Sequence, residues 1–275
     1  MSKRKNPFAW LGAPYYLWAA VFIIIPLLLV VWYGLTDSTG AFTFENVAAI
    51  LNPAHSKALL LSILLSLAAT GVCLLLAYPL CMILTSLQKK ANSFIVLILI
   101  LPMWMNFLLR TYAWQSLLEK AGIINSLLSS LGLPAQHLIN TPGAIVFGMV
   151  YDFLPFMVLP IYTSLQKIDH NVINAAHDLG AGHVQTFLRV IFPLSLPGVI
   201  SGITMVFIPG LTTFVISSLL GGGKILLIGN VIEQEFTQAY DWNLGSGLSL
   251  VLLIFIILNV ILSTLTDKDQ EGVVK

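Results

Sequence analysis

The sequence has 275 residues, of which 57% are hydrophobic and only 9% are Asp, Glu, Lys or Arg. Soluble domains carry about 25% charged residues, so this composition excludes a water-soluble protein and predicts a chain embedded in a membrane. The formal net charge is +1, and without a concentrated basic surface the chain is not expected to bind nucleic acid.

Six stretches of the chain are apolar enough to cross the hydrocarbon core as helices, which takes about 20 residues each. In chain order they are residues 15–35, 59–84, 94–109 with its flanks, 144–165, 194–220 and 244–265. The third stretch is the least regular, because Asn106 and Arg110 interrupt its end. Residues 123–133 are too short and too rich in serine to span, and they predict a surface or interfacial helix. The expected fold class is therefore all-α, a polytopic membrane protein with six transmembrane helices.

Basic residues are distributed unevenly between the two sides that these spans define. With the N-terminus inside, the inner segments hold nine Lys or Arg residues, namely Lys3, Arg4, Lys5, Lys89, Lys90, Lys167, Arg189, Lys268 and Lys275. The outer segments hold four, namely Lys57, Arg110, Lys120 and Lys224. This excess follows the positive-inside rule, so both termini and the segment between the fourth and fifth spans are predicted to face the cytoplasm.

Proline and small residues within the spans predict how the helices bend and pack. Seven prolines fall inside them, namely Pro26, Pro79, Pro102, Pro155, Pro160, Pro197 and Pro209. Each removes a backbone donor, which indicates either bent helices around a pathway or the ordinary enrichment of proline in membrane helices. Gly198 and Gly202, spaced Gly-x-x-x-Gly, predict the close approach of a neighbouring helix. Cys73 and Cys81 would lie about 12 Å apart along a helix, too far for a disulfide, so they are expected to act as small hydrophobic side chains.

The sequence lacks the motifs that carry most enzyme chemistry. It contains no His-Glu-x-x-His, Cys-x-x-Cys or Gly-x-Ser-x-Gly motif, and its five histidines are scattered. Residues 221–224 resemble part of a phosphate loop, but Ser218 stands in place of the first glycine and Ile225 in place of the hydroxyl residue. We therefore expect no catalytic residue and no metal ligand in this chain.

Residues 174–198 form a segment rich in small residues between two apolar spans. Asp169 is a suitable N-cap for a helix over residues 170–179, and Gly180 is placed to end it. After Gly182, a second helical pattern has an apolar stripe until Pro193 ends it. The stripe consists of Val184, Phe187, Leu188 and Ile191.

Such a helix pair on the cytoplasmic side has two possible roles. It could lie among the lipid headgroups with its apolar stripe buried, or it could dock into a groove of a cytoplasmic partner. An interfacial helix is expected to carry Lys and Arg along its polar face. The second helix holds only Arg189, and the first helix carries the opposite charge of Asp178. This composition favours docking.

The same segment resembles the signature of binding-protein-dependent ABC importer permeases. That signature begins Glu-Ala-Ala, has Gly four residues after the second Ala, and ends in Ile-x-Leu-Pro after nine further residues. Here Ala175 and Ala176 match the alanines and Gly180 matches the glycine. Asn174 replaces the usual Glu, and Phe192 replaces the Leu. The resemblance implies a loop that docks on an ATP-hydrolysing subunit, formed by Asn174, Ala175, Ala176, Asp178, Gly180, Val190, Phe192 and Pro193.

The resemblance extends over residues 101–114, 151–169, 175–202 and 219–232 and is strongest to the B-type permeases of spermidine/putrescine importers. It implies a type I ABC importer permease fold, with residues 1–275 as a single transmembrane permease domain and residues 166–193 as its cytoplasmic coupling loop. The implied function is to move polyamines into a bacterial cell as a non-catalytic, multi-pass subunit of its inner membrane. The implied partners are a C-type permease, two ATPase subunits that bind the ATP and magnesium, an external substrate-binding protein and membrane lipid.

Asp152 is the one acidic residue within the predicted spans. An ionisable residue at that depth indicates a functional role by default, either in binding a cationic cargo or as the partner of Arg110, which is expected at similar depth. Aromatic faces near the outer end of the third span could hold an ammonium group. The predicted substrate pathway consists of Trp104, Asn106, Arg110, Tyr112, Tyr151, Asp152 and Phe214. The outer-loop acids Glu233, Glu235 and Asp241 either attract cations or stay solvated.

Two alternative functions are compatible with the same sequence. Another cargo, such as an inorganic anion or iron, would keep the fold and change the substrate, although an intramembrane Asp152 disfavours an anion. A polytopic enzyme, or a channel that works without an ATPase, is the alternative from another class. An enzyme is expected to show a catalytic set on one membrane face, and a channel has no need of a docking loop.

Overall fold

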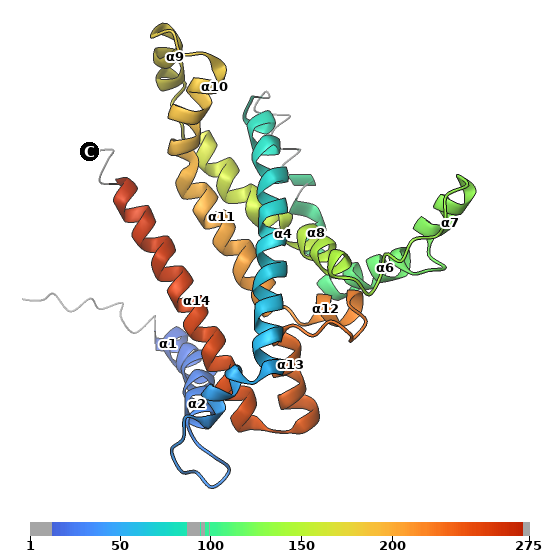
Figure 1. Cartoon of the computed structure of the whole chain (residues 1–275). Coiled ribbons are helices and arrows are strands. Elements are labelled where there is room, and N and C mark those ends of the chain that lie inside the picture. The colour runs from blue at the N-terminus through green and yellow to red at the C-terminus, as the bar shows by residue number, and fades with distance from the viewer. Residues whose placement is uncertain (1–12, 87–93, 95–96, 99, 272–275) are drawn as a thin grey trace, which may run out of the picture. The chain divides into compact units, whose positions relative to one another are not determined.

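The structure is a computed structural model that describes residues 13–86, 94, 97–98 and 100–271. Within these ranges the chain is built from helices, and the only extended pairing is an isolated bridge between Thr36 and Phe42. Figure 1 shows the order of the elements along the chain. The chain divides into two compact units, residues 1–56 with 231–255 and residues 57–230 with 256–275. The predicted all-α class is confirmed.

Five helices in the described part of the chain are long and apolar enough to cross a membrane. They cover Pro14–Gly34, Pro53–Ser86, Pro142–Gln166, His183–Thr212 and Trp242–Ile261. These helices fall on the first, second, fourth, fifth and sixth predicted spans, so the prediction of a polytopic membrane protein is confirmed.

The first unit joins the start of the chain to the segment that precedes its last span. It contains α1 (Ala13–Ala19), the π-helical turn η2 (Ala20–Ile24), α2 (Ile25–Gly34), α3 (Glu45–Ala48), η3 (Ala49–Leu51), the end of α13 (Ile228–Gln234), η6 (Glu235–Ala239) and the first part of α14 (Trp242–Glu271). The carbonyl oxygen of Thr36 accepts hydrogen bonds from Asn46 Nδ2 at 2.8 Å and from Asn243 Nδ2 at 2.6 Å. Because the last carbonyls of a helix lack partners within it, these bonds fix the chain where it leaves α2.

The second unit contains the helices that surround the predicted pathway. They are most of α4 (Pro53–Ser86), η4 (Leu101–Trp104), α6 (Phe107–Leu118), α7 (Ile123–Ser130), α8 (Pro142–Gln166), α9 (His170–Asp178), α10 (His183–Thr186), the π-helical turn η5 (Phe187–Ile191), α11 (Phe192–Thr212) and α12 (Val215–Leu220). Its hydrophobic core is formed mainly by α4, α8 and α11 and includes the fully enclosed Met149, Met157 and Ile161. The helix pair α9 and α10 lies at the end of α11 opposite α12 (Figure 1). The short helix predicted over residues 123–133 is confirmed as α7.

Helices α8 and α11 approach each other closely because glycine replaces side chains at their interface. A Cβ atom at Gly198 would lie 2.5 Å from the carbonyl oxygen of Pro160, and one at Gly202 would lie 2.7 Å from Met157 Sδ. The close approach predicted from the Gly-x-x-x-Gly spacing is confirmed.

The two cysteines of α4 pack against α8. Cys73 and Cys81 are both free and fully buried. Cys81 Sγ lies 3.4 Å from the carbonyl oxygen of Val158, and Cys73 Sγ lies 3.9 Å from that of Val150. Because thiols are weak donors, these side chains act chiefly as small hydrophobic groups in the core, as predicted.

Replacing Gly198 with alanine is expected to lower the free energy of unfolding by about 1–3 kcal/mol, the usual cost of overpacking. The added methyl group would press against Pro160 O and Ser164 Cβ, both 2.5 Å away, so α8 and α11 must separate. Thermal unfolding of the detergent-solubilised chain measures the effect. Gly71 of α4 is the matched control, since a Cβ there meets no atom within 4 Å and alanine favours the helix. Equal unfolding midpoints for the two alanine variants would contradict the tight α8–α11 contact.

The helix that leads into α11 continues through Pro193, so the prediction that this proline ends it is wrong. The turn η5 ends two residues before Pro193, and the N–H of Phe192 donates to the carbonyl of Phe187, five positions back. Proline lacks an N–H and clashes with the carbonyl four residues back, and the wider π turn removes this conflict. α10, η5 and α11 therefore run as one helix over His183–Thr212. The same arrangement, with η2, precedes Pro26.

The predicted third span, residues 94–109, lies partly outside the described residues, and its described part is broken. η4 ends at Trp104, and α6 begins after Asn106. Asn106 Oδ1 accepts hydrogen bonds from the N–H groups of Leu108 at 2.8 Å and Leu109 at 3.4 Å. Asn106 therefore caps a new helix, and the prediction of one continuous helix over residues 94–109 with its flanks is wrong.

The predicted fifth span, residues 194–220, is also divided. α11 ends at Thr212, Thr213 is extended with a ψ of 137°, and α12 begins at Val215. The carbonyl of Phe214 accepts the N–H of Ser218 at the start of α12 and also a hydrogen bond from Asn230 Nδ2, both at 2.9 Å. The prediction of a single helix over these residues is wrong because a side chain from another element stabilises the interruption.

Candidate functional site

A cleft of about 510 Å³ opens between α6, α8 and α11 in the second unit. Its lining consists of Met103, Met105, Phe107, Arg110, Asp152, Phe153, Phe156, Pro209 and Thr213. Six of these residues are Met, Phe or Pro, and two carry opposite charges. A mostly apolar cleft with a few polar groups is the usual composition of a small-molecule site.

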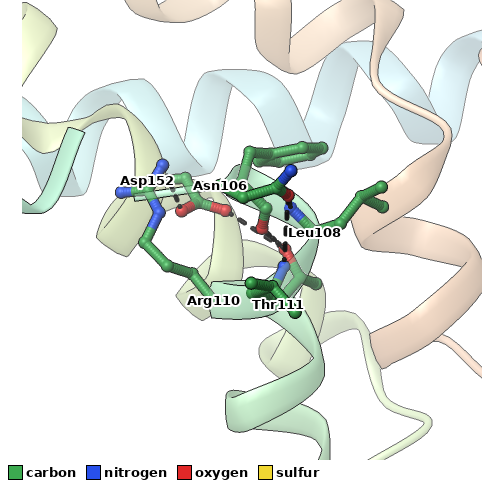
Figure 2. Close-up of polar contacts among 7 residues, drawn as sticks. Asn106, Leu108, Arg110, Thr111 and Asp152 are labelled. Atoms are coloured by element: carbon green, nitrogen blue, oxygen red, sulfur yellow. Dashed lines mark hydrogen bonds and ion pairs between the residues drawn. The ribbon is translucent and has the colours of Figure 1, made fainter. Parts of the chain in front are cut away.

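Arg110 of α6 and Asp152 of α8 point toward each other in the wall of the cleft (Figure 2). Arg110 Nη2 lies 3.3 Å from Asp152 Oδ1, and the two side chains are only 8% and 3% exposed. Removing a charge from water is costly unless an opposite charge is near. The sequence left two roles open for Asp152, and the structure shows one of them, the ion pair with Arg110.

The ion pair is incompletely hydrogen-bonded. Among the described residues, Asp152 Oδ1, Arg110 Nε and Arg110 Nη1 have no hydrogen-bond partner. Asp152 Oδ2 has a long contact of 3.5 Å with Thr111 Oγ1, whose hydroxyl also donates to the carbonyl of Phe107 at 3.0 Å. A hydroxyl has a single hydrogen, so the shorter bond to Phe107 takes it. The carboxylate of Asp152 keeps the capacity to accept further donors.

Aromatic side chains lie beside the guanidinium group. Arg110 Cζ lies 5.9 Å from the ring centroid of Tyr151, a cation–π distance. The Tyr151 ring meets Trp114 edge to face at 5.2 Å, and Trp114 meets Phe147 edge to face at 4.6 Å. Such edge-to-face pairs are favourable, so the cluster holds the Tyr151 ring next to Arg110.

Both helix interruptions of the second unit open onto the cleft. Met105 follows η4 and Thr213 follows α11, and both residues line the cleft. Irregular backbone at membrane depth is tolerated only where it is buried in protein or lines a cavity. Binding sites of many transporters are formed by discontinuous helices of this kind.

The structure brings together three of the seven predicted pathway residues, namely Arg110, Tyr151 and Asp152. Trp104 and Tyr112 are exposed on η4 and α6, and Phe214 is exposed at the break between α11 and α12. Asn106 serves as the cap of α6. None of these four lines the cleft, and for them a place in the pathway stays a prediction.

The segment predicted to dock on a partner forms two short helices joined by a glycine turn. Asp169 Oδ1 accepts a hydrogen bond from the N–H of Asn171 at 2.9 Å and so caps α9, as predicted. Gly180 has a φ of 83°, the left-handed conformation that favours glycine after a helix. The N–H of Ala181 donates to the carbonyl of Ala176 at 3.0 Å, which completes the turn. The predicted stop at Gly180 is confirmed.

Large apolar side chains on this helix pair are exposed. Leu179, Val184 and Leu188 are 89%, 70% and 57% exposed, respectively. Phe187 and Ile191 pack against the core instead. The predicted apolar stripe is therefore divided between two faces, because the wider π turn of η5 changes the angle between successive side chains. Neighbouring exposed apolar side chains are typical of a contact surface.

Most residues of the predicted docking loop are exposed, namely Asn174, Ala175, Asp178, Gly180, Phe192 and Pro193. Ala176 and Val190 are half-buried. Tyr78 of α4 contacts the segment from the core side, because its hydroxyl lies 2.7 Å from Ser195 Oγ and its ring centroid lies 5.7 Å from that of Phe187. The junction of η5 and α11 is therefore held directly against α4.

Asn230 is a buried residue that the sequence analysis does not single out. Its side chain is 2% exposed. Nδ2 donates to Phe214 O at 2.9 Å and to Ser218 Oγ at 2.7 Å, while Oδ1 accepts from the N–H of Leu227 at 3.1 Å and from the Ser217 hydroxyl. A lone amide within residues 225–232, which are otherwise apolar or glycine, is the signal that points to it.

The sequence matches, over residues 5–268, the family described as "Binding-protein-dependent transport system inner membrane component". It is 38% identical over 245 residues to the spermidine/putrescine transport system permease protein PotB of Salmonella typhimurium (strain SL1344), which covers 86% of this chain and 85% of that protein. It is 36% identical over 249 residues to PotB of Haemophilus influenzae, with 88% and 87% covered. A chain of the solved bacterial alginate ABC transporter in complex with alginate pentasaccharide-bound periplasmic protein has a TM-score of 0.69 at 15% identity, with 92% and 91% covered.

These similarities include both units of the chain. At 15% identity, the likeness to the alginate transporter shows the fold alone, and that fold is the importer permease architecture expected from the sequence. The family match and the identity to the two PotB proteins extend over most of the length. The chain therefore belongs to the binding-protein-dependent ABC importer permeases, which are multi-pass components of the inner membrane.

Proposed function

We propose that this chain is a pore-forming subunit of an importer that moves polyamines such as spermidine or putrescine into the cytoplasm. The relatives that are 36–38% identical over most of the chain are named as spermidine/putrescine permeases, which supports this cargo. The observation that carries the proposal is the mostly apolar cleft with Asp152 in its wall. Polyamines alternate ammonium groups with methylene chains, so a carboxylate beside Phe and Met side chains suits both parts of the molecule.

The cleft offers several groups that replace the hydration of a cation. A bare ammonium group in hydrocarbon is costly and needs carboxylates, carbonyls or aromatic faces. The lining contains the carboxylate of Asp152 and the rings of Phe107, Phe153 and Phe156. α11 ends beside the cleft, and the C-terminal end of a helix carries partial negative charge. These features favour an organic cation over an anion.

ATP hydrolysis in this proposal belongs to partner subunits. The exposed apolar residues Leu179, Val184 and Leu188 support docking of α9 and α10 on an ATPase. Residues 166–193 then act as the coupling loop of a permease domain that comprises residues 1–275. Two ATPase subunits bind the ATP and magnesium, a C-type permease supplies the other half of the pore, and an external binding protein delivers the polyamine. The excess of basic residues in the inner segments supports cytoplasmic termini and a cytoplasmic coupling loop.

Transport follows alternating access. Closure of the ATPase pair pushes on α9 and α10, and the continuous helix over His183–Thr212 carries that motion from the coupling loop to the cleft. Tyr78 transfers part of the motion to α4 through its contacts with Phe187 and Ser195. The interruptions at Met105 and Thr213 are the places where the cleft can change shape, because the backbone there is held by few helical hydrogen bonds.

Uptake of radiolabelled spermidine by cells that lack this chain tests the proposal. Restoring the chain is expected to restore uptake, and unlabelled putrescine is expected to compete whereas sulfate is not. The transported label must remain inside after washing, which separates uptake from surface binding. If uptake is not restored although the chain is present in the membrane and bound to its partners, the polyamine cargo is wrong while the family assignment stands.

A further inference from the structure

The ion pair in the cleft is not arranged as a stable structural pair. A carboxylate can accept about four hydrogen bonds and an arginine side chain can donate five. In the described structure, Arg110 Nη2 lies 3.3 Å from Asp152 Oδ1 without forming a hydrogen bond, and Nε and Nη1 of Arg110 have no partner. Arginine and carboxylate groups that stabilise a protein interior usually form two short parallel hydrogen bonds. This pair keeps most of its hydrogen-bonding capacity unused.

The unpartnered atoms are enclosed in the wall of the cleft. Arg110 and Asp152 both line the cleft of about 510 Å³, although their side chains are more than nine-tenths buried. Buried polar groups that lack partners are rare in folded proteins because each costs free energy. Because Arg110 Nη2 lies 3.3 Å from the enclosed Asp152 Oδ1, a second donor that arrives through the cleft reaches this oxygen only when the guanidinium group moves aside.

Arg110 has a second favourable contact besides Asp152. Its Cζ lies 5.9 Å from the ring centroid of Tyr151, and a guanidinium group is well suited to stacking on an aromatic face. The Tyr151 ring is held in place by Trp114, 5.2 Å away. If Arg110 leaves Asp152, its charge is therefore still partly compensated by the cation–π contact.

We infer that Arg110 is a displaceable counter-ion, which occupies Asp152 between transport events and competes with the ammonium group of the cargo for that carboxylate. This inference rests on the proposed polyamine function. Arg110 is the residue that sets the affinity of the cleft for the polyamine. An arriving ammonium group takes the contact with Asp152 Oδ1, and the guanidinium group moves away from the carboxylate while it keeps its contact with the Tyr151 ring. A small inorganic cation does not gain from the Phe and Met lining, so it does not displace Arg110. When the polyamine leaves, Arg110 returns to Asp152.

Kinetics of spermidine uptake by the complete transporter test the competition. Replacing Arg110 with glutamine removes the competing charge and is expected to lower the KM for spermidine by about tenfold or more, because the loss of one close charge–charge interaction has about this effect even at the dielectric constant of water. Asp152→Asn is expected to abolish saturable uptake while the complex still assembles. If the pair is only structural, Arg110→Gln instead lowers the amount of folded protein and leaves the KM unchanged.

A matched pair of variants at Tyr151 keeps the test valid if Arg110→Gln does not fold. Tyr151→Leu removes the ring that receives Arg110 and is expected to raise the KM by about threefold, the strength of a partly exposed cation–π contact. Tyr151→Phe retains the ring and is expected to leave the KM unchanged. Both variants lose the hydroxyl group, so the difference between them reports the aromatic face.

The outcomes separate the inference from the proposed function. Normal spermidine uptake by the unaltered chain together with an unchanged or higher KM in Arg110→Gln overturns the inference and leaves the polyamine function standing. Equal KM values for Tyr151→Leu and Tyr151→Phe also overturn it. Absence of spermidine uptake by the unaltered chain overturns the proposed function and the inference with it.

Discussion

Replacing Leu179 with aspartate is expected to abolish polyamine uptake while the chain remains in the membrane at its normal level. Leu179 is 89% exposed, so the substitution removes little packing within the chain and leaves its free energy of unfolding nearly unchanged. If Leu179 lies at the centre of the ATPase contact, the loss of a central apolar contact costs about 2 kcal/mol or more, which weakens association by about thirtyfold. Co-purification of the ATPase with the tagged chain measures association, and uptake of labelled spermidine measures coupling.

Leu131 provides a matched control for this substitution. It is 69% exposed, it ends the short helix α7, and like Leu179 it precedes a glycine in the left-handed conformation, Gly132 with a φ of 74° against 83° for Gly180. Leu131→Asp therefore introduces the same charge in the same local geometry, away from the proposed coupling loop. Loss of uptake in both variants would mean that a charge at a helix end impairs insertion. Normal ATPase binding and uptake in Leu179→Asp would contradict the docking surface.

Features with a local cause could be predicted from the sequence. The cap at Asp169 and the stop at Gly180 were predicted correctly because each depends on a few neighbouring residues and their backbone conformation. The close approach of a neighbouring helix to α11 was predicted because Gly198 and Gly202 lie on one helix face, and the structure identifies that neighbour as α8. Hydropathy was sufficient for the long uninterrupted spans, since burial in lipid requires little beyond apolar length.

Features that depend on distant residues could not be predicted in this way. Hydropathy does not show that the fifth span is interrupted, because both sides of the break are apolar. In the third span, Asn106 marks an irregularity in the sequence, but its role as the cap of a new helix is seen only in the structure. The break after Thr212 is stabilised by a hydrogen bond from Asn230, a residue of α13, to the carbonyl of Phe214. The continuation of the helix through Pro193 depends on the π turn η5, whose backbone pattern leaves no simple mark in residue type.

The two charged residues of the candidate site could be predicted from the sequence, but their arrangement could not. Asp152 and Arg110 stand out as charged residues in apolar surroundings, and their expected depths allowed either a pair or a cargo site. Only the structure shows that they pair at 3.3 Å with unused hydrogen-bonding atoms. The contribution of Pro209 and Thr213 to the same cleft was not predictable, because it follows from the packing of α11 on α8.

Replacing Asn230 with leucine is expected to destabilise the second unit strongly. Leucine would fill a similar volume but leave the N–H of Leu227 without its partner and remove the hydrogen bonds of Asn230 with Phe214 O and with the Ser217 and Ser218 hydroxyl groups. Each buried polar group that loses its hydrogen bond costs about 1–3 kcal/mol, so the free energy of unfolding is expected to fall by about 3 kcal/mol or more. Thermal unfolding of the solubilised chain and its amount in the membrane measure the loss.

Asn125 separates this effect from the general cost of removing a buried amide. It is also 2% exposed, and it bonds to the backbone of Glu119 and Gln136 in the α7 segment. Asn125→Leu is expected to destabilise that segment and leave the KM for spermidine unchanged. In Asn230→Leu, the protein that still folds is expected to show an altered KM, because Phe214 adjoins Thr213 in the wall of the cleft. If the KM changes in both variants, or in neither, the break after α11 has no specific role in cargo binding.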